Sequence, residues 1–176
     1  MITSPEFSAA VEVPLDEIDG IMKVCLDYWQ NLRGVHRAPT WRKFCIMDLP
    51  AKVIPFVTVV DVKREPLAFT YRFWGTGHQG AKRVERTGQT LLADDNRSAD
   101  AVLDDYVIMA DSWTPRVFKR NIRLPEPKLP ITQLSLHLPL SATDEQVDHI
   151  LSICDWWSFR ESWPDFHQTD NRKISP

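Results

Sequence analysis

A glycine-rich stretch at residues 75–80 is the part of the sequence whose spacing best fits a known chemistry. It reads GTGHQG and matches the pattern G-x-G-x-x-G, in which backbone N–H groups at the start of a helix hold the pyrophosphate of a dinucleotide. Asp94 and Asp95 follow about 20 residues later, where such a site places the acidic residue that binds a ribose hydroxyl. The first question is therefore whether the chain binds NAD.

The residues before the glycines argue against that chemistry. A Rossmann unit needs a nearly continuous apolar strand, whereas AFTYRFW (68–74) alternates as an antiparallel strand does. Its two predicted faces carry Phe69, Tyr71 and Phe73, and Thr70, Arg72 and Trp74. The run FVTVVDV (56–62) precedes it by too few residues for a crossover helix, so the two runs predict an antiparallel hairpin.

The residues after the glycines lead to the same conclusion. The segment AKRVER (81–86) gives roughly two turns with little apolar face, and Thr87-Gly88 ends it, which leaves no room for the helix of a dinucleotide site. We interpret the glycine match as chance and expect no NAD. The glycines let the chain leave a strand and turn sharply. The sequence requires no cofactor and leaves the identity of any cofactor unknown.

Charge and composition limit the class of partner. The 176 residues include 21 Lys and Arg and 24 Asp and Glu, a net charge of −3, and the basic residues are scattered, so we expect neither nucleic acid nor an acidic membrane surface as partner. The three cysteines lack the spacing of a disulfide scaffold or zinc site, and the N-terminus lacks an apolar signal segment. These features predict a cytoplasmic protein.

No group of residues has the spacing of a metal or catalytic site. The sequence has no G-x-S-x-G elbow, and the acidic residues between 94 and 105 lack the D-x-D-x-D-G order of a calcium loop, so we assign them to helix capping and a solvated face. The histidines share no metal-ligand spacing either: His36, His78, His137, His149 and His167. We predict no metal site and no catalytic residue, and we expect His78 to be an exposed loop residue.

An amphipathic helix is predicted over residues 14–34, with Pro14 in its first turn and Gly34 just beyond its end. Its apolar residues are spaced by three and four: Leu15, Ile18, Met22, Cys25, Trp29 and Leu32. This face suits packing on the domain's own sheet, and the same spacing suits a short seam with a second copy in a homodimer. The sequence leaves both readings open.

The remaining elements predict the fold class. A short helical turn is expected around residues 49–54 and a helix over 99–113, and three strands are expected at 115–124, at 131–140 and within 147–159. We therefore expect an α+β fold with an antiparallel sheet of about five strands and helices on one face. The domain should span residues 14–160, with a disordered segment at 1–13 and a polar tail at 161–176.

Several strings in this order resemble a small single-domain family of bacterial PAS-like proteins, the PAS_5 type. The strings are Leu26-Asp27-Tyr28-Trp29 with Leu32-Arg33-Gly34 and Arg37-Ala38-Pro39, Val59-Val60-Asp61-Val62, Phe69-Thr70-Tyr71-Arg72-Phe73 with Gly75-Thr76, Thr87-Gly88, and Leu138-Pro139-Leu140-Ser141 with Val147-Asp148-His149-Ile150-Leu151. The chain departs from the family between the Gly-Thr and Thr-Gly pairs, where GHQGAKRVER stands in place of an apolar helix. The resemblance implies a non-catalytic sensory or protein-interaction module that often dimerises, with a small-molecule ligand or a signalling protein as partner.

A ligand cavity in such a fold should lie between the inner face of the sheet and the helices near residues 77–112. Its expected lining is Tyr71, Phe73, Tyr106, Phe118 and Leu136, with Arg72, His78 and Arg120 as the polar candidates. Tyr71 and Arg72 are neighbours on a strand, so only one of them can point inward. Arg72 and Arg120 need anionic partners if they are buried, either in a structural salt bridge or on a ligand carboxylate or phosphate.

Two other functions fit the same sequence. The chain could be a small cone-shaped enzyme whose cavity holds a His/Asp pair, such as His137 with a carboxylate, and a strongly perturbed histidine pKa in a deep pocket would support that class. It could also be an adaptor whose exposed tryptophans mark a protein interface. The tryptophans concerned are Trp113, Trp156, Trp157 and Trp163.

Overall fold

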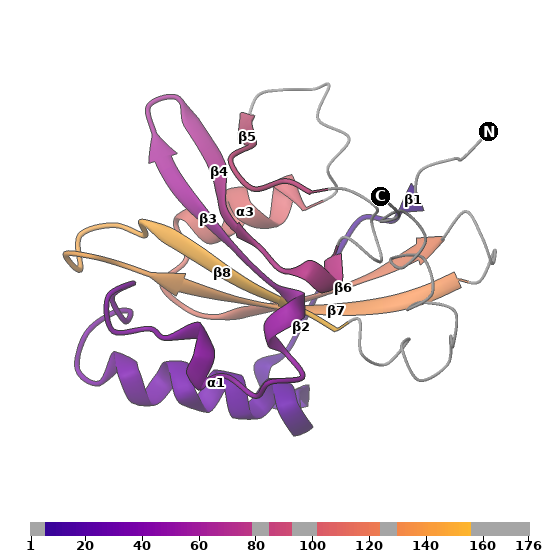
Figure 1. The fold of residues 1–176 in the computed structure, drawn as a ribbon, viewed down its shortest axis with the longest axis horizontal. Helices are drawn as coiled ribbons and strands as arrows, with labels where there is room; N and C mark the ends of the chain where they lie inside the picture. Colours follow the sequence, from indigo (N-terminus) through magenta and orange to yellow (C-terminus); the bar gives the residue numbers. More distant parts are fainter. Residues whose placement is uncertain (1–5, 79–84, 93–101, 124–129, 156–176) are drawn as a thin grey trace, which may run out of the picture.

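The computed structural model describes residues 6–78, 85–92, 102–123 and 130–155. These residues form an α+β fold around one antiparallel sheet of eight strands (Figure 1). The strand order is β1-β6-β7-β8-β3-β4-β5, and β2 also pairs with β6. The strands are β1 (Glu6–Phe7), β2 (Val11–Val13), β3 (Val57–Arg64), β4 (Leu67–Trp74), β5 (Thr90–Leu92), β6 (Arg116–Arg123), β7 (Pro130–Leu140) and β8 (His149–Cys154).

The five predicted strands form the contiguous centre of this sheet, in the order β4-β3-β8-β7-β6. The hairpin β3–β4 comes first, the chain then passes through α3 (Leu103–Ala110), and the meander β6–β7–β8 returns so that the last strand pairs with β3. The sheet is larger than expected because β1, β2 and β5 add short edge pairings. The expectation of disorder over 1–13 is wrong for residues 6–13, since β1 and β2 pair with β6 there.

The predicted helix over 14–34 is divided in two. A short 3-10 helix, η1 (Leu15–Glu17), is followed by extended backbone at Ile18 and then by α1 (Gly20–Arg33), which is capped by Gly34 with φ +55°. Two further 3-10 helices, η2 (Ile46–Asp48) and η3 (Ile54–Phe56), lie near the helical turn that was expected at 49–54.

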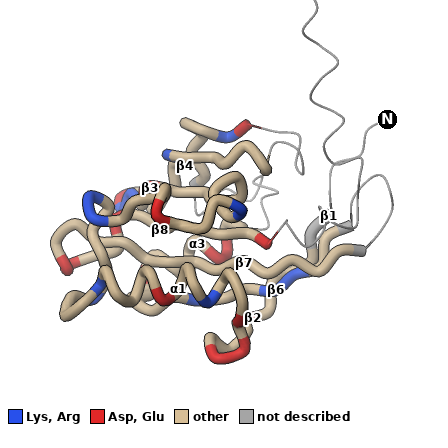
Figure 2. Tube along the Cα trace, turned by 60° about the horizontal axis from the view of Figure 1, so that its bottom comes forward, with Lys and Arg blue, Asp and Glu red and all other residues tan. Residues whose placement is uncertain are grey.

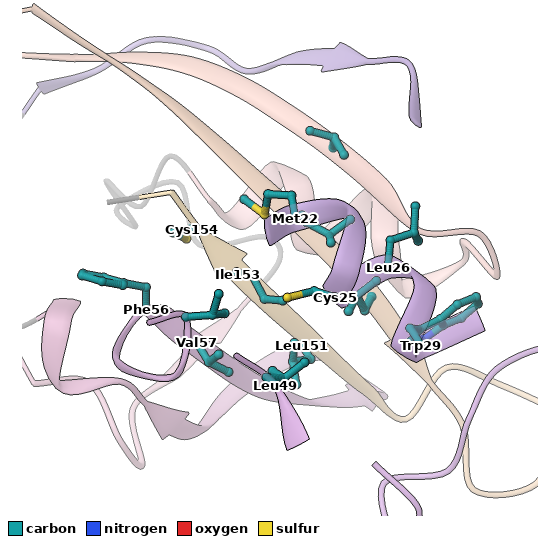
Figure 3. Packing of buried hydrophobic residues seen from close by; sticks show 14 of the residues in the cluster. Met22, Cys25, Leu26, Trp29, Leu49, Phe56, Val57, Leu151, Ile153 and Cys154 are labelled. Carbon is teal, nitrogen blue, oxygen red and sulfur yellow. The ribbon is translucent and has the colours of Figure 1, made fainter. Parts of the chain in front are cut away.

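The apolar face of α1 packs on the sheet of its own chain (Figure 3). Met22, Cys25 and Trp29 are at most 6% exposed, and the Trp29 Nε1 donates a hydrogen bond to the Pro139 carbonyl oxygen at 2.8 Å. Ile18 is also buried, and Leu15 and Leu32 pack against the same cluster. The six residues assigned to a dimer seam are therefore used inside one chain, because the sheet already covers the face they share.

The helices cover both faces of the sheet, so the expectation of helices on one face is wrong. Leu151 lies in the cluster beneath α1, whereas its neighbour Ile150 lies in a second cluster with Tyr106 and Met109 of α3. Successive side chains of a strand point to opposite faces, and the central strands are apolar on both. Each face must then be covered, and within the described residues α1 covers one face and α3 the other.

A β-bulge in the β3–β4 hairpin changes the predicted faces of β4. The register shifts between Val59 and Val60, so that Val60 lies opposite Tyr71 and Val59 lies opposite Phe73. Tyr71 consequently packs in the α3 cluster and Phe73 against the α1 cluster. The expectation that Tyr71 and Phe73 share a face is wrong, because the extra residue of a bulge reverses the alternation beyond it.

The glycine match at the end of β4 serves close packing of the chain. A Cβ on Gly75 would lie 2.2 Å from the Pro55 carbonyl oxygen, and one on Gly77 would lie 2.5 Å from the Phe56 ring. β4 is antiparallel to both β3 and β5, which is not the parallel strand that a dinucleotide site follows. Gly75 therefore leaves no room for a side chain against backbone, and Gly77 leaves none against the Phe56 ring. Residues 79–84, which include the rest of the match, lie outside the described part.

Candidate functional site

The face of the sheet that α3 covers carries a row of buried polar residues. On β7, Gln133, Ser135 and His137 are at most 3% exposed, while the leucines between them lie on the α1 side. Ser152 of β8 lies directly opposite His137, and Arg120 of β6 lies directly opposite Gln133. Because burial of polar groups costs free energy unless they are hydrogen-bonded, this row needs partners on the same face.

The strongest of these interactions is an ion pair in the interior. The Arg120 Nη2 donates a hydrogen bond to the Asp105 Oδ2, and the two side chains are 1% and 2% exposed. Asp105 belongs to α3, so the pair connects the helix to the sheet. Removing two charges from water costs free energy, which their mutual attraction offsets. Loss of either partner would leave the other charge buried and would destabilise the fold.

Arg120 has more donors than this pair uses. Its Nε and Nη1 are buried without a hydrogen-bond partner, and so is the Nε2 of Gln133 across the ladder. Elsewhere in the described chain, Arg64 donates to Asp111 and to the carbonyl oxygens of Ala110 and Val147. Arg64 keeps one nitrogen, Nε, without a partner, whereas Arg120 keeps two and is more deeply buried, with side-chain exposures of 29% and 1%. Buried donors in this state need an acceptor that the described protein atoms do not supply.

His137 lies at the centre of the row and makes two short contacts. Its Nδ1 lies 2.9 Å from the Ser152 Oγ, and its Nε2 lies 3.1 Å from the Ser135 Oγ and 3.6 Å from the Asp105 Oδ2. Burial and, secondarily, the charge of Arg120 lower the pKa of His137 to about 3. The imidazole is therefore neutral near pH 7, with one ring nitrogen donating and the other accepting.

Aromatic rings surround the polar row. Phe118 lies 5.2 Å and Tyr106 lies 5.9 Å from the ring centre of His137, both nearly edge-on. Tyr106 in turn contacts Tyr71 and Phe69 with centroid distances of 6.1 and 5.5 Å. The arrangement places a few convergent polar groups against a large apolar surface.

The structure brings together four of the eight residues that were expected to line a cavity. Tyr71, Tyr106, Phe118 and Arg120 all lie on the α3 side of the sheet. Leu136 and Phe73 pack toward α1, because strand alternation places the first there and the bulge places the second. Arg72 is exposed on the surface, where its Nε and Nη2 donate to the Asp61 carboxylate at 2.6 and 2.9 Å.

His78 is buried, which corrects the expectation of an exposed loop histidine. It is 0% exposed and lies 4.9 Å from the ring centre of Trp74 and 6.5 Å from that of Phe56. The close approach of the glycine segment to Phe56 brings His78 under the end of β4. It packs beside the α3 cluster through Trp74.

Sequence reasoning missed Asp105, Gln133, Ser135 and Ser152 as members of the site. Asp105 was assigned to a solvated acidic face, although it is 1% exposed. The signal for it was the helical spacing, since Asp105 lies three residues after Val102 and four before Met109, both of which are buried. The signal for Gln133 and Ser135 was their alternation with leucine on a central strand.

The other titratable pairs lie at the surface. His36 Nδ1 lies 2.7 Å from the Asp144 Oδ2, a contact that is the main cause of a lowered pKa for the Asp144 carboxyl. His149 Nδ1 lies 2.8 Å from Asp61. Acidic and basic residues are interspersed along the described chain (Figure 2), and its His, Cys, Asp and Glu side chains form no group of three or more suited to a metal ion.

A groove of about 530 Å³ lies between β2 and the start of β6, where its lining residue Arg116 is the ladder partner of His137. It is lined by Glu12, Val13, Pro14, Leu15, Thr114, Pro115 and Arg116. The Arg116 Nη1 donates to both oxygens of Glu12 at 2.7 Å, so the charges of the groove satisfy each other. None of the residues expected to line a ligand cavity lies in this groove.

The tryptophans proposed for an adaptor surface are only partly described. Trp113 is half-buried against both clusters, and the Arg37 guanidinium lies 3.7 Å from its ring centre. The other three, at positions 156, 157 and 163, lie outside the described residues, as do His167 and the predicted tail at 161–176. Trp113 thus serves packing between the two clusters.

Comparisons with protein-family models, with curated proteins and with solved structures found no match for this chain. Among the helices that the structure describes, none has the length and apolar character needed to cross a membrane.

Proposed function

We propose that this chain is a non-catalytic PAS-like module of bacterial signalling that senses a small molecule in the layer between α3 and the sheet. The observation that carries the proposal is the buried Arg120 on β6, which keeps two nitrogens without acceptors, opposite Gln133, whose Nε2 also has no acceptor. Buried donors without an acceptor lower the stability of the folded protein, because they lose their hydrogen bonds to water. A bound ligand would supply that acceptor.

The arrangement of elements supports the PAS-like part of the proposal. A hairpin (β3–β4), a helical segment and a three-strand meander (β6–β7–β8) follow each other, and the first and last of these strands are neighbours in the sheet. The buried row lies on the strands of the meander and beneath the helix between the two groups. Ligand occupancy would therefore act on α3 directly, through Asp105, and α3 is the element through which we expect a signal to leave the site.

A catalytic role for the His137 and Asp105 pair is supported less well. The two side chains do lie 3.6 Å apart, and the histidine pKa is strongly perturbed. A general base, however, works best when its pKa is near the working pH, and an imidazole with a pKa of about 3 is a weak base at pH 7. The Asp105 Oδ2 is also engaged by Arg120.

Native mass spectrometry of the protein purified from its own cells tests the proposal. The native mass, compared with the denatured mass, should exceed that of the chain by a small molecule, and an absorbance scan should show whether that molecule is a chromophore. The variant Arg72→Gln, which changes an exposed arginine, should keep the extra mass, whereas the double variant Asp105→Leu with Arg120→Met should lose it. A native mass without added ligand, together with no thermal stabilisation by a metabolite panel, would contradict the sensor function.

A further inference from the structure

We propose that the ligand is a small organic acid, whose carboxylate accepts hydrogen bonds from Arg120 and Gln133 in the layer between β6, β7 and α3. This inference rests on the proposed function and names the chemical class of the molecule that the module would sense.

The donors of the site lie on neighbouring strands. Arg120 and Gln133 are direct partners in the β6–β7 ladder, and their side chains share the α3 face. Each residue is 2% exposed, and the three nitrogens Arg120 Nε, Arg120 Nη1 and Gln133 Nε2 have no acceptor. Side chains of directly paired residues lie within reach of one another, so one acceptor-rich group can contact both. A carboxylate offers two oxygens that only accept, which matches a set of donors.

The charge of the site requires that an acid bind together with a proton. Asp105 and Arg120 neutralise each other, so a carboxylate would leave one uncompensated negative charge in the interior. His137 can remove that excess by taking up a proton. The groups that face it are Asp105 and Tyr106 from α3, Arg120 and Phe118 from β6, Ser135 from its own strand β7 and Ser152 from β8. Arg116 of β6 lies directly opposite His137 in the ladder, and its charge is paired with Glu12 of β2.

The proton uptake follows from the interaction of His137 with Arg120. The positive charge of Arg120 contributes to the low pKa of His137 in the protein without ligand. An anion bound to the guanidinium would offset this repulsion and raise the pKa of His137. The site can therefore accept an acid and one proton without a change in net charge, whereas a neutral amide would bring no such proton.

The surroundings specify the remainder of the ligand. Phe118 and Tyr106 approach the polar row from β6 and α3, and Tyr71 and Phe69 extend the apolar surface along β4. An apolar or aromatic body attached to the carboxylate would bury its surface against these rings. Benzoate and phenylacetate are suitable probes of that shape, and acetate tests the carboxylate alone.

Titration calorimetry at pH 7 with these three acids, each against its primary amide, tests the inference. At least one acid should bind, and its amide should bind at least tenfold more weakly, because the amide lacks the charge. Repeating the titration in two buffers of different ionisation enthalpy should show uptake of up to one proton per bound acid. Phosphate buffer is avoided so that the only oxyanion offered to Arg120 is the probe.

Three variants show whether binding uses the named residues. Gln133→Leu removes one neutral donor and should weaken acid binding by about 5- to 10-fold, as expected for the loss of one hydrogen bond. The double variant Asp105→Leu with Arg120→Met removes the ion pair as a unit and should abolish binding, while circular dichroism shows that it remains folded. Arg72→Gln is the matched control and should leave the affinity unchanged.

Several outcomes would overturn the inference. The first is equal affinity for acids and amides, and the second is acid binding that survives the double variant. The third is an affinity for all three acids weaker than about 10 mM. The fourth is a crystal structure, grown with the acid, in which only water contacts the Nε and Nη1 of Arg120. A co-purified molecule without an acid group would refute the carboxylate and leave the sensor function standing. Absence of any bound molecule and of any stabilising metabolite would contradict both.

Discussion

The two faces of the sheet differ in what they bury. Beneath α1, the chain packs an apolar cluster that includes Cys25, Trp29 and Leu151, each at most 2% exposed. Beneath α3, the same central strands bury Arg120 and His137 to the same degree. The two faces are formed by alternating residues of the same strands. One strand can therefore contribute to a stable core on one face and to a polar site on the other.

The difference shows what each face requires. Buried apolar side chains stabilise the fold in proportion to the apolar area they bury, and this contribution does not depend on specific partner atoms. A buried charge requires specific partners at specific atoms, and Arg120 finds only part of its set within the described protein. The α1 face is thus suited to stability, and the α3 face is suited to recognition.

The largest effect is expected on the α1 face, from Trp29→Ala. The substitution removes a large ring that is 2% exposed and a hydrogen bond to the Pro139 carbonyl oxygen, so it should lower the free energy of unfolding by about 3–5 kcal/mol. Urea unfolding followed by circular dichroism measures this change. Val24→Ala is the control on the exposed side of α1, where Val24 is 53% exposed, and it should change stability by less than about 0.5 kcal/mol.

A comparable effect is expected on the α3 face when one charge of its pair is removed. Asp105→Asn leaves the Arg120 guanidinium buried without a counter-charge and should cost about 3–5 kcal/mol. The double variant Asp105→Leu with Arg120→Met removes both charges and should recover most of this loss in the same urea experiment. If Asp105→Asn were as stable as the wild type, the contrast between the two faces would be lost.

A smaller effect is expected from pH, through His137. Its folded pKa of about 3 lies below the ordinary 6.5, so as the pH falls the unfolded chain binds a proton at this residue before the folded chain does. Stability therefore decreases on acidification, and this residue alone should account for about 1 kcal/mol between about pH 7 and about pH 5.5. The variant His137→Gln should be less stable overall but should lack this part of the slope. Parallel slopes in the two proteins would contradict a neutral buried imidazole.

The smallest effect is expected at the surface, from Arg72→Met. Arg72 makes two hydrogen bonds to Asp61, but the two side chains are 45% and 35% exposed, so solvent screens the pair. The substitution should lower the free energy of unfolding by no more than about 1 kcal/mol, and added salt should reduce the difference further. A loss of stability as large as that expected for Asp105→Asn would show that the difference in burial between Arg72 and Arg120 does not determine how much each ion pair contributes.

Local sequence patterns were sufficient to predict most of the elements. The five central strands, α1, α3 and the β3–β4 hairpin follow from periodicity and from a connector too short for a crossover. The short strands β1 and β2 were missed, because Glu6–Phe7 and Val11–Val13 are too brief to show a period and form only where β6 offers an edge. The break between η1 and α1 was missed because the apolar spacing continues across it.

The candidate site could be predicted only in part. The sequence correctly predicted that the site lies beneath the helix and includes Tyr106, Phe118 and Arg120. The position of Phe73 was not predictable, because it depends on a β-bulge for which the local sequence gives no signal. Asp105 could be read as a solvated acid or as a buried partner, because a carboxylate in a helix fits both.

The sequence by itself determined which residues are apolar and how they alternate along the central strands, but it led us to expect helices on one face, and only the tertiary structure showed that both faces are covered. Only the tertiary structure decided that Asp105 of α3 meets Arg120 of β6, since these residues lie on different elements whose contact is not local. The same holds for the unpartnered donors of Arg120 and Gln133. The partners of a buried charge are atoms that the fold brings together from distant parts of the chain. The sequence shows the charged residue but does not show which atoms will lie next to it.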